Sequence, residues 1–190
     1  MGGPVRPAVG GVVGWVAVLC CTGARIWAAS GPWWIVPAMF VHGVVLVHHF
    51  SLQHECVHYT VFRTRWLNDL AGNICGFGIL RPHQHFRYGH CDHHTYTPLH
   101  GRDPELIPLP KTIGGYLWYI SSVPSGRNKC AELFRDVAGR LGAGEGVFLR
   151  MEARAVVFLE ARLMAALYAV IFVACALTGW WAPVWYWWLP

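Results

Sequence analysis

Long apolar runs dominate the pattern of hydrophobic and polar positions, and the first of them begins close to the N-terminus. Residues 8–24 contain no charge, and the apolar character resumes after Arg25. About twenty apolar residues are enough to cross a bilayer as a helix, so we predict a membrane span over residues 8–29. A cleaved signal peptide is the alternative. Arg6 would then be the only basic residue before the apolar run, and the bulky Trp27 would lie next to the cleavage site, where small residues are usual.

A second apolar run predicts the partner of the first in a helical hairpin. Ser30–Pro32 has the composition of a turn, and the two tryptophans that follow it are typical of a membrane interface. We predict the second span over residues 33–53. The pattern contains no stop signal at its end, so we expect the helix to leave the bilayer carrying His54 and His58 with it.

The later apolar stretches are of two kinds. Leu67–Leu80 has only fourteen residues, with polar residues near its start and glycines near its end, which favours an interfacial or re-entrant helix over a span. The 28 residues from Leu163 to the last residue carry no charge. We predict a third span over residues 161–179, an interfacial turn, and the first turns of a fourth span over residues 183–190.

The segments between these runs are polar or mixed. Lys129–Leu141 has the spacing of an amphipathic helix with Leu133, Phe134 and Val137 on its apolar side. Arg102–Pro110 is rich in proline, so we expect an extended connection with no chemistry of its own.

Composition and charge define the class of protein. Hydrophobic residues make up 55% of the chain and charged residues 13%, which indicates an all-α integral membrane protein rather than a soluble one. Of the fifteen Lys and Arg residues, thirteen lie between Arg63 and Arg162, and the acidic residues share the middle of the chain with them. This mixture is not a nucleic-acid-binding patch, and anionic lipid is the better partner. The positive-inside rule places the region 54–160 on the cytoplasmic face, within a single domain 1–190.

Ten of the eleven histidines fall between His48 and His100, and they form two tight clusters. His54 and His58 are four residues apart, so on a helix they project from one face. The second cluster is His90, His93 and His94, whose spacing also fits one helical face. Imidazole is a good ligand for transition metals, and five imidazoles exceed what one tetrahedral zinc accepts, so two metal ions fit better. Nitrogen ligation with open positions suits iron and oxygen chemistry.

The remaining histidines and the cysteines have weaker claims. His42 lies inside the second predicted span, where we expect a buried, hydrogen-bonded histidine rather than a ligand. The seven cysteines are odd in number and lack C-x-x-C spacing, so they predict no disulfide framework. Cys56 and Cys91 lie within the clusters, where small packing residues are commoner than thiolate ligands.

A zinc protease is the main alternative. His54-Glu55-Cys-Val-His58 matches H-E-x-x-H, in which two histidines bind zinc and the glutamate acts as general base. This hypothesis leaves the second cluster without a role and provides no clear third ligand. A metal-binding membrane protein without catalysis is a further alternative.

The two clusters in their context resemble the membrane fatty acid desaturase superfamily, which includes related hydroxylases and carotenoid ketolases. H-x-x-x-H ends the second predicted membrane helix, and H-x-x-H-H follows an interfacial stretch. Gln53–His58 stands where desaturases show Q-H-D-x-x-H, and Arg87–His90 with Thr95–Thr97 is similar to their approach to and exit from the second histidine box. The resemblance covers Val9–Pro190.

The resemblance implies a diiron, O2-dependent enzyme that introduces a double bond into a fatty acyl chain, or a related diiron hydroxylase or ketolase. It implies electrons from a separate ferredoxin or cytochrome b5 type donor, and an acyl lipid in the bilayer as substrate. No catalytic residue beyond the metal centre is expected. The implied iron ligands are His54, His58, His90, His93 and His94. Residues expected to orient them are Glu55 and Asp92, with His49 and His85 as further neighbours of the site.

One departure from the family pattern is clear. The family has a third histidine box, another H-x-x-H-H, beyond its last pair of membrane helices, and this sequence has no histidine after His100. The simplest interpretation is a chain truncated before that box, which we expect to be weakly loaded with iron and to have little activity by itself. Two tightly bound irons per 190-residue chain would contradict this expectation.

Overall fold

The computed structural model describes residues 5–28, 32–107, 109–188 and 190, and within them it contains helices and no strand. Among the described residues, three helices are long and apolar enough to cross a membrane: Gly10–Ala28, Trp33–Val57 and Met151–Thr178. The predicted class, an all-α membrane protein, is therefore confirmed. The turn expected at Ser30 and Gly31 lies outside the described residues.

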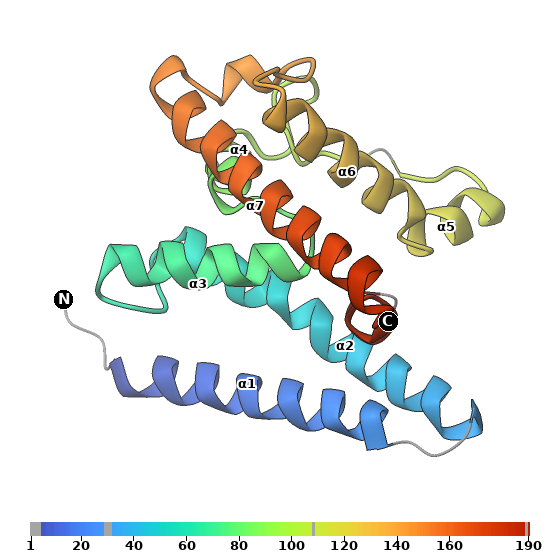
Figure 1. Cartoon of the computed structure of the whole chain (residues 1–190). Coiled ribbons are helices and arrows are strands. Elements are labelled where there is room, and N and C mark those ends of the chain that lie inside the picture. Colours follow the sequence, from blue (N-terminus) through green and yellow to red (C-terminus); the bar gives the residue numbers. More distant parts are fainter. Residues whose placement is uncertain (1–4, 29–31, 108, 189) are drawn as a thin grey trace. The chain divides into compact units, whose positions relative to one another are not determined.

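The chain divides into two compact units, one formed by the chain up to Ile79 together with the chain from Ala169, the other by Leu80–Tyr168. In the first unit, α1 (Val5–Ala28) and α2 (Pro32–Val57) lie side by side as a hairpin (Figure 1). His42 is 1% exposed, and its Nδ1 is 2.8 Å from the Thr22 hydroxyl of α1. The ring of His49 packs edge-on against Trp15. His42 is thus the buried, hydrogen-bonded histidine that its place in an apolar run predicted.

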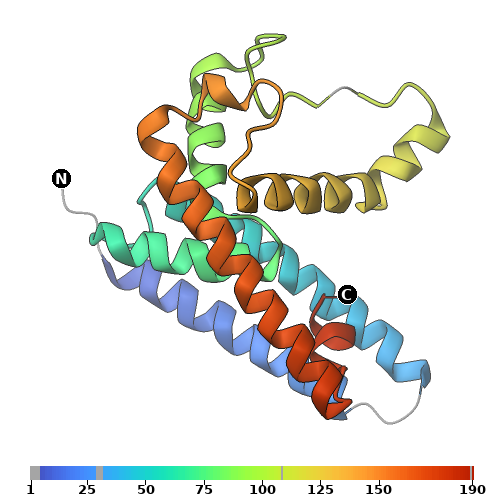
Figure 2. The same ribbon diagram turned by 45° about the horizontal axis from the view of Figure 1, so that its top comes forward.

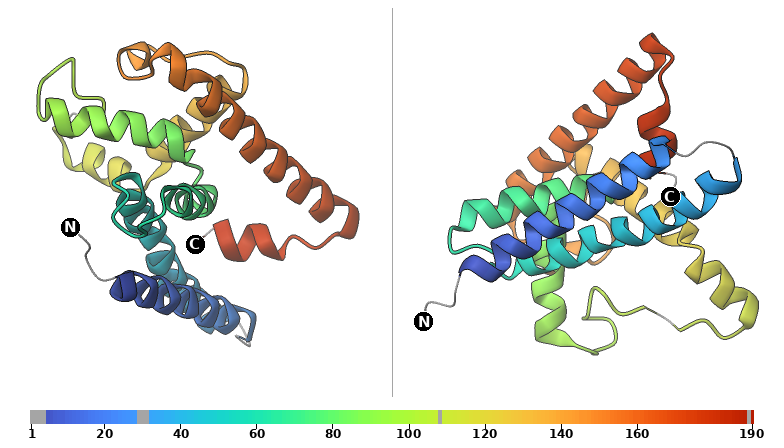
Figure 3. Two further views of the ribbon diagram at one scale, coloured as in Figure 1. Left: turned by 90° about the vertical axis from the view of Figure 1, so that its left-hand side faces the viewer. Right: turned by 90° about the horizontal axis from the view of Figure 1, so that it is seen from below.

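Helix α3 (Arg65–Gly78) lies against the second half of α2 (Figure 3, right). Its buried positions are Asn68, Gly72, Cys75 and Gly76, which share one face at helical spacing. These small side chains let two helices approach closely. A Cβ on Gly78 would lie 2.9 Å from the His49 ring, which shows how close the approach is. The opposite face of α3 exposes Trp66, Leu70 and Ile74.

The second unit contains α4 (His83–Tyr96), α5 (Ile113–Ile120), α6 (Val123–Val137), the short η1 (Glu145–Val147) and the first part of α7 (Met151–Thr178). Helices α5 and α6 follow one another directly (Figure 2), with Ser122 in the left-handed region at the junction. The buried side of α7 in this unit is formed by Ala153, Val157, Glu160, Ala161, Met164 and Tyr168. Glu160 accepts a hydrogen bond from the Gln84 amide at the start of α4, at 2.7 Å.

Several features differ from the sequence-based expectations. Helix α7 begins at Met151, before the start predicted at residue 161, because its charged first turns still present an apolar face to the second unit. On α6 the expected apolar side is wrong in one position: Phe134 is 70% exposed, and the buried residues of that helix are Leu133 and Asp136. The segment predicted to start a fourth span contains one π-helical turn, η2 (Val184–Trp188).

Candidate metal centre

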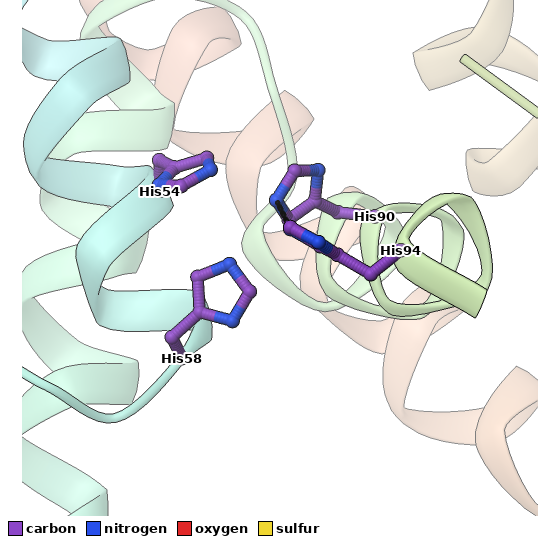
Figure 4. Close-up of side chains that lie close together, drawn as sticks. All are labelled: His54, His58, His90 and His94. Carbon is purple, nitrogen blue, oxygen red and sulfur yellow. Dashed lines mark hydrogen bonds between the residues drawn. The ribbon is translucent and has the colours of Figure 1, made fainter. Parts of the chain in front are cut away.

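The first histidine cluster lies where α2 ends. His54 is in the last turn of the helix, and His58 follows directly after its final residue in a turn closed by the Tyr59 amide on the Cys56 carbonyl. The two imidazole rings have centroids 4.9 Å apart and are inclined by 64° (Figure 4). The side chain of His54 is 32% exposed, and His58 is exposed. Adjacent rings at an accessible helix end can share one metal ion.

Buried amides fix the backbone on both sides of this cluster. The Gln53 side chain, fully buried in α2, donates to the Gly72 carbonyl of α3 at 3.3 Å. Asn68, also fully buried, accepts from the Phe62 amide at 3.1 Å and donates to the carbonyls of Phe62 and Thr64. The loop after His58 is therefore tied to α3, which sets where the first cluster lies in its unit.

Glu55 lies beside this cluster and is tied to the turn. Its Oε2 accepts from the Thr60 hydroxyl at 2.7 Å, and its Oε1 is 3.4 Å from Nδ1 of His54. The second distance is long for a charge-assisted hydrogen bond. Glu55 is thus held first by the turn and only loosely by the imidazole.

The second cluster is carried by α4, as the spacing of its histidines predicts. Nε2 of His90 and Nε2 of His94 are 3.0 Å apart, and the two rings are nearly perpendicular (Figure 4). The His93 ring stacks on that of His90, with centroids 5.8 Å apart. His90 is only 4% exposed, so this cluster is partly buried in its unit.

Two carboxylates from the following loop bind the other ring nitrogens of this cluster. Nδ1 of His93 is 2.7 Å from Oδ1 of Asp103, and Nδ1 of His90 is 3.1 Å from Oε2 of Glu105. A carboxylate only accepts, so each Nδ1 carries the proton. The Nε2 atoms are then the nitrogens available to a metal ion.

The supporting loop is itself held in place. The Asp103 and Arg102 amides donate to the Leu99 carbonyl, which turns the chain back toward α4. The Glu105 carboxylate is 3.5 Å from the Arg81 guanidinium, which stacks over the Phe86 ring. Burial acts to raise the pKa of Asp103, but the hydrogen bonds from His93 and from nearby backbone amides outweigh it and lower that pKa. Asp103 is therefore an ionised partner for His93.

The donor geometry fits a metal ion. Two nitrogens bound to one ion at about 2.1 Å are roughly 3 Å apart when they occupy neighbouring coordination positions. The Nε2 atoms of His90 and His94 have this separation. Without a metal they share a proton in a hydrogen bond, and an ion can take the place of that proton.

The other residues expected near the metal have the following surroundings. Asp92 has a buried Oδ2 without a hydrogen-bond partner in the described part of the chain. His49 is buried against α1, and its Nδ1 is hydrogen-bonded to the Leu46 carbonyl oxygen at 2.8 Å. His85 is buried and bonded to Asp136 of α6. Asp103 and Glu105, which hold imidazoles, were not expected from the sequence. The sequence feature that could have indicated them is the presence of two acidic residues shortly after the H-x-x-H-H motif.

Taken together, these features define a helical, histidine-rich membrane protein whose α4 imidazoles are arranged for metal binding. A family model described as fatty acid desaturase matches residues 31–190. The chain therefore belongs to the fatty acid desaturase family.

Individual relatives agree with this assignment. An sn-1 oleoyl-lipid 12-desaturase of Picosynechococcus sp. is 30% identical over 124 residues, covering 57% of this chain and 36% of that protein. A desaturase of the same name from Arthrospira platensis is 37% identical over 70 residues, covering 36% of this chain and 20% of the relative. The chloroplastic omega-6 fatty acid desaturase of Spinacia oleracea is 25% identical over 84 residues, covering 44% of this chain and 19% of the relative. The chain thus spans about a third or less of these relatives' lengths. No solved structure matches.

Proposed function

We propose that this chain forms part of a membrane-bound, iron-dependent acyl-lipid desaturase that uses O2. The observation that supports this most is the α4 cluster, in which Nε2 of His90 and Nε2 of His94 face each other at 3.0 Å while carboxylates hold Nδ1 of His90 and His93. Family membership supplies the reaction class, and the names of the relatives supply the substrate class, an acyl lipid.

We infer that five imidazoles are the iron ligands that this chain contributes: His54, His58, His90, His93 and His94. Bound iron supplies the redox chemistry by which O2 is reduced to water while two hydrogens leave adjacent carbons of the acyl chain. The balance requires two further electrons, which we assign to a separate ferredoxin or cytochrome b5 type donor. Hydroxylation by a related diiron route is the alternative outcome.

Residues of this chain orient the imidazoles and provide an apolar surface for lipid. Asp103 and Glu105 keep a proton on Nδ1 of their imidazoles, which directs Nε2 to the metal. The exposed apolar face of α3, with Trp66, Leu70 and Ile74, is suited to acyl chains near the membrane surface. The basic residues between Arg63 and Arg162 support a cytoplasmic location for the clusters.

A paired comparison of substitutions tests this function. The chain is expressed in a bacterial membrane, and its iron content and the host's acyl-lipid double bonds are measured by elemental and lipid mass spectrometry. We expect His90→Ala to lose bound iron and any product, and Glu55→Gln to retain most iron. A zinc protease using His54, Glu55 and His58 would keep its metal in His90→Ala, and Glu55→Gln would abolish proteolysis rather than metal binding. Retention of iron in His90→Ala would contradict the assignment.

A further inference from the structure

A second group of potential metal ligands lies in the Leu80–Tyr168 unit and shares no residue with the histidines assigned above. It consists of His85 in the first turn of α4, Glu132 on α6 and Glu145 in η1. One potential ligand atom from each lies within 4.8 Å of those of the other two. One imidazole and two carboxylates are a common donor set for a divalent transition metal.

A buried carboxylate orients the imidazole of this group. Asp136 is fully buried on α6, and its Oδ2 is 2.6 Å from Nδ1 of His85. Nε2 of the same ring is 4.0 Å from Oε1 of Glu132. The arrangement repeats the one on His93, where Asp103 holds Nδ1 and leaves Nε2 for a metal. The second oxygen of Asp136 is buried and has no hydrogen-bond partner in the described part of the chain.

These side chains open onto a cavity of about 370 Å³. Its wall includes His85, Glu132, Glu145, Phe148 and Asp103. A water occupies roughly 30 Å³ of liquid volume, so the cavity accommodates an ion with several waters. Asp103 is also the partner of His93, so the cavity borders the loop that supports the α4 cluster.

Two basic side chains neutralise the carboxylates in the absence of a metal. Lys129 lies 2.8 Å from Glu132, and Arg135 lies 2.9 Å from Glu145. Both basic side chains are more exposed, at 27% and 39%, than the carboxylates, at 14% and 12%. They can move outward without disturbing the backbone, whereas Glu145 stays fixed by the Gly142 amide at 2.6 Å.

We propose that His85, Glu132 and Glu145 bind a divalent transition-metal ion, with Asp136 as the residue that positions His85. The mixed nitrogen and oxygen donors suit Mn²⁺ better than the all-imidazole α4 cluster does. This difference separates the two sites experimentally. The proposal does not depend on the desaturase reaction.

Mn²⁺ titration of the purified chain in lipid nanodiscs tests the proposal, with free Mn²⁺ followed by its electron paramagnetic resonance signal. We expect one bound Mn²⁺ that survives His90→Ala. Glu132→Gln and His85→Gln remove it, and Asp136→Asn weakens it by about 10–100-fold. The matched controls are Glu152→Gln and His100→Gln, two exposed positions where binding stays unchanged.

Circular dichroism and the thermal melting of each variant distinguish a lost site from a lost fold. A folded Glu132→Gln protein that binds Mn²⁺ as the wild type does would overturn the proposal, and the cluster would then be an ion-pair network only. Loss of the bound Mn²⁺ in His90→Ala would also overturn it, because the ion would then belong to the α4 histidines.

Discussion

The two histidine clusters of this chain are built in different ways. On α4 the imidazoles are oriented by side chains: His90 is buried, and Asp103 and Glu105 hold the Nδ1 atoms at 2.7–3.1 Å. At the end of α2 the imidazoles are placed by the backbone, since Gln53 and Asn68 tie the helix end and the following loop to α3. The α4 imidazoles are therefore oriented by their own side-chain partners, whereas the α2 imidazoles have a fixed place but more exposed rings.

The largest expected effect comes from removing a carboxylate of the α4 cluster. Asp103→Asn should lower the affinity for Fe²⁺ by about 10–100-fold, because His93 loses the carboxylate that holds its Nδ1 proton and orients its ring. Glu55→Gln should cost less than about 10-fold, because Glu55 is only loosely bonded to His54. Anaerobic Fe²⁺ titration with a competing chelator measures both. Equal losses in the two variants would show that the clusters are alike.

The next effect concerns the hydrogen bonds that fix the backbone around the α2 cluster. Asn68→Ala removes three hydrogen bonds in a buried setting, so we expect a loss of about 1–3 kcal/mol in unfolding free energy. Thermal unfolding in detergent checks this. Asn73→Ala is the control, because Asn73 makes one bond to the Asp69 carbonyl within its own helix. If Asn68→Ala is no less stable than the control, the loop after His58 is not fixed by α3.

The smallest expected effect concerns His85 and the dependence of stability on pH in metal-free protein. Burial alone would lower the pKa of His85, but the hydrogen bond with Asp136 and the charges of Glu132 and Glu145 outweigh it and raise that pKa. A histidine whose pKa is higher in the folded state stabilises the fold fully below its unfolded pKa of about 6.5 and loses that contribution as pH rises through the folded value.

We therefore expect the advantage in melting temperature of the wild type over His85→Gln to be largest below pH 6.5 and to shrink at higher pH. Melting curves recorded with a chelator present over a series of pH values measure this advantage. An advantage that grows with pH would mean that His85 is neutral in the fold.

Much of the fold followed from the sequence because lipid-facing helices are continuously apolar. The uncharged runs predicted α1, α2 and the later part of α7, since each must satisfy its backbone within the helix and present apolar side chains to lipid. The early part of α7 did not follow, because charged residues interrupt the apolar run up to Arg162. In the structure Glu160 caps α4 through Gln84, and Arg162 donates to the Val137 carbonyl.

The candidate site was predictable only in its imidazoles. Helical spacing placed His90, His93 and His94 on one helix, which needs only local geometry. The contacts of Asp103 and Glu105 depend on a loop that turns back onto α4, and a proline-rich composition indicated only an extended chain. Burial of Asp136 likewise depends on His85 as its partner, so periodicity alone favoured Phe134 as the inward residue of α6.

We infer that the carboxylates of Asp103 and Glu105 prepare the α4 imidazoles to bind a metal through Nε2. The most direct test is a ¹⁵N NMR spectrum of histidine-labelled, metal-free protein in nanodiscs at about pH 8, with signals assigned by comparison with His90→Ala and His93→Ala. We predict that His90 and His93 carry their protons on Nδ1. Protons on Nε2 of these two rings would contradict it, because the nitrogens that face the site would then be blocked.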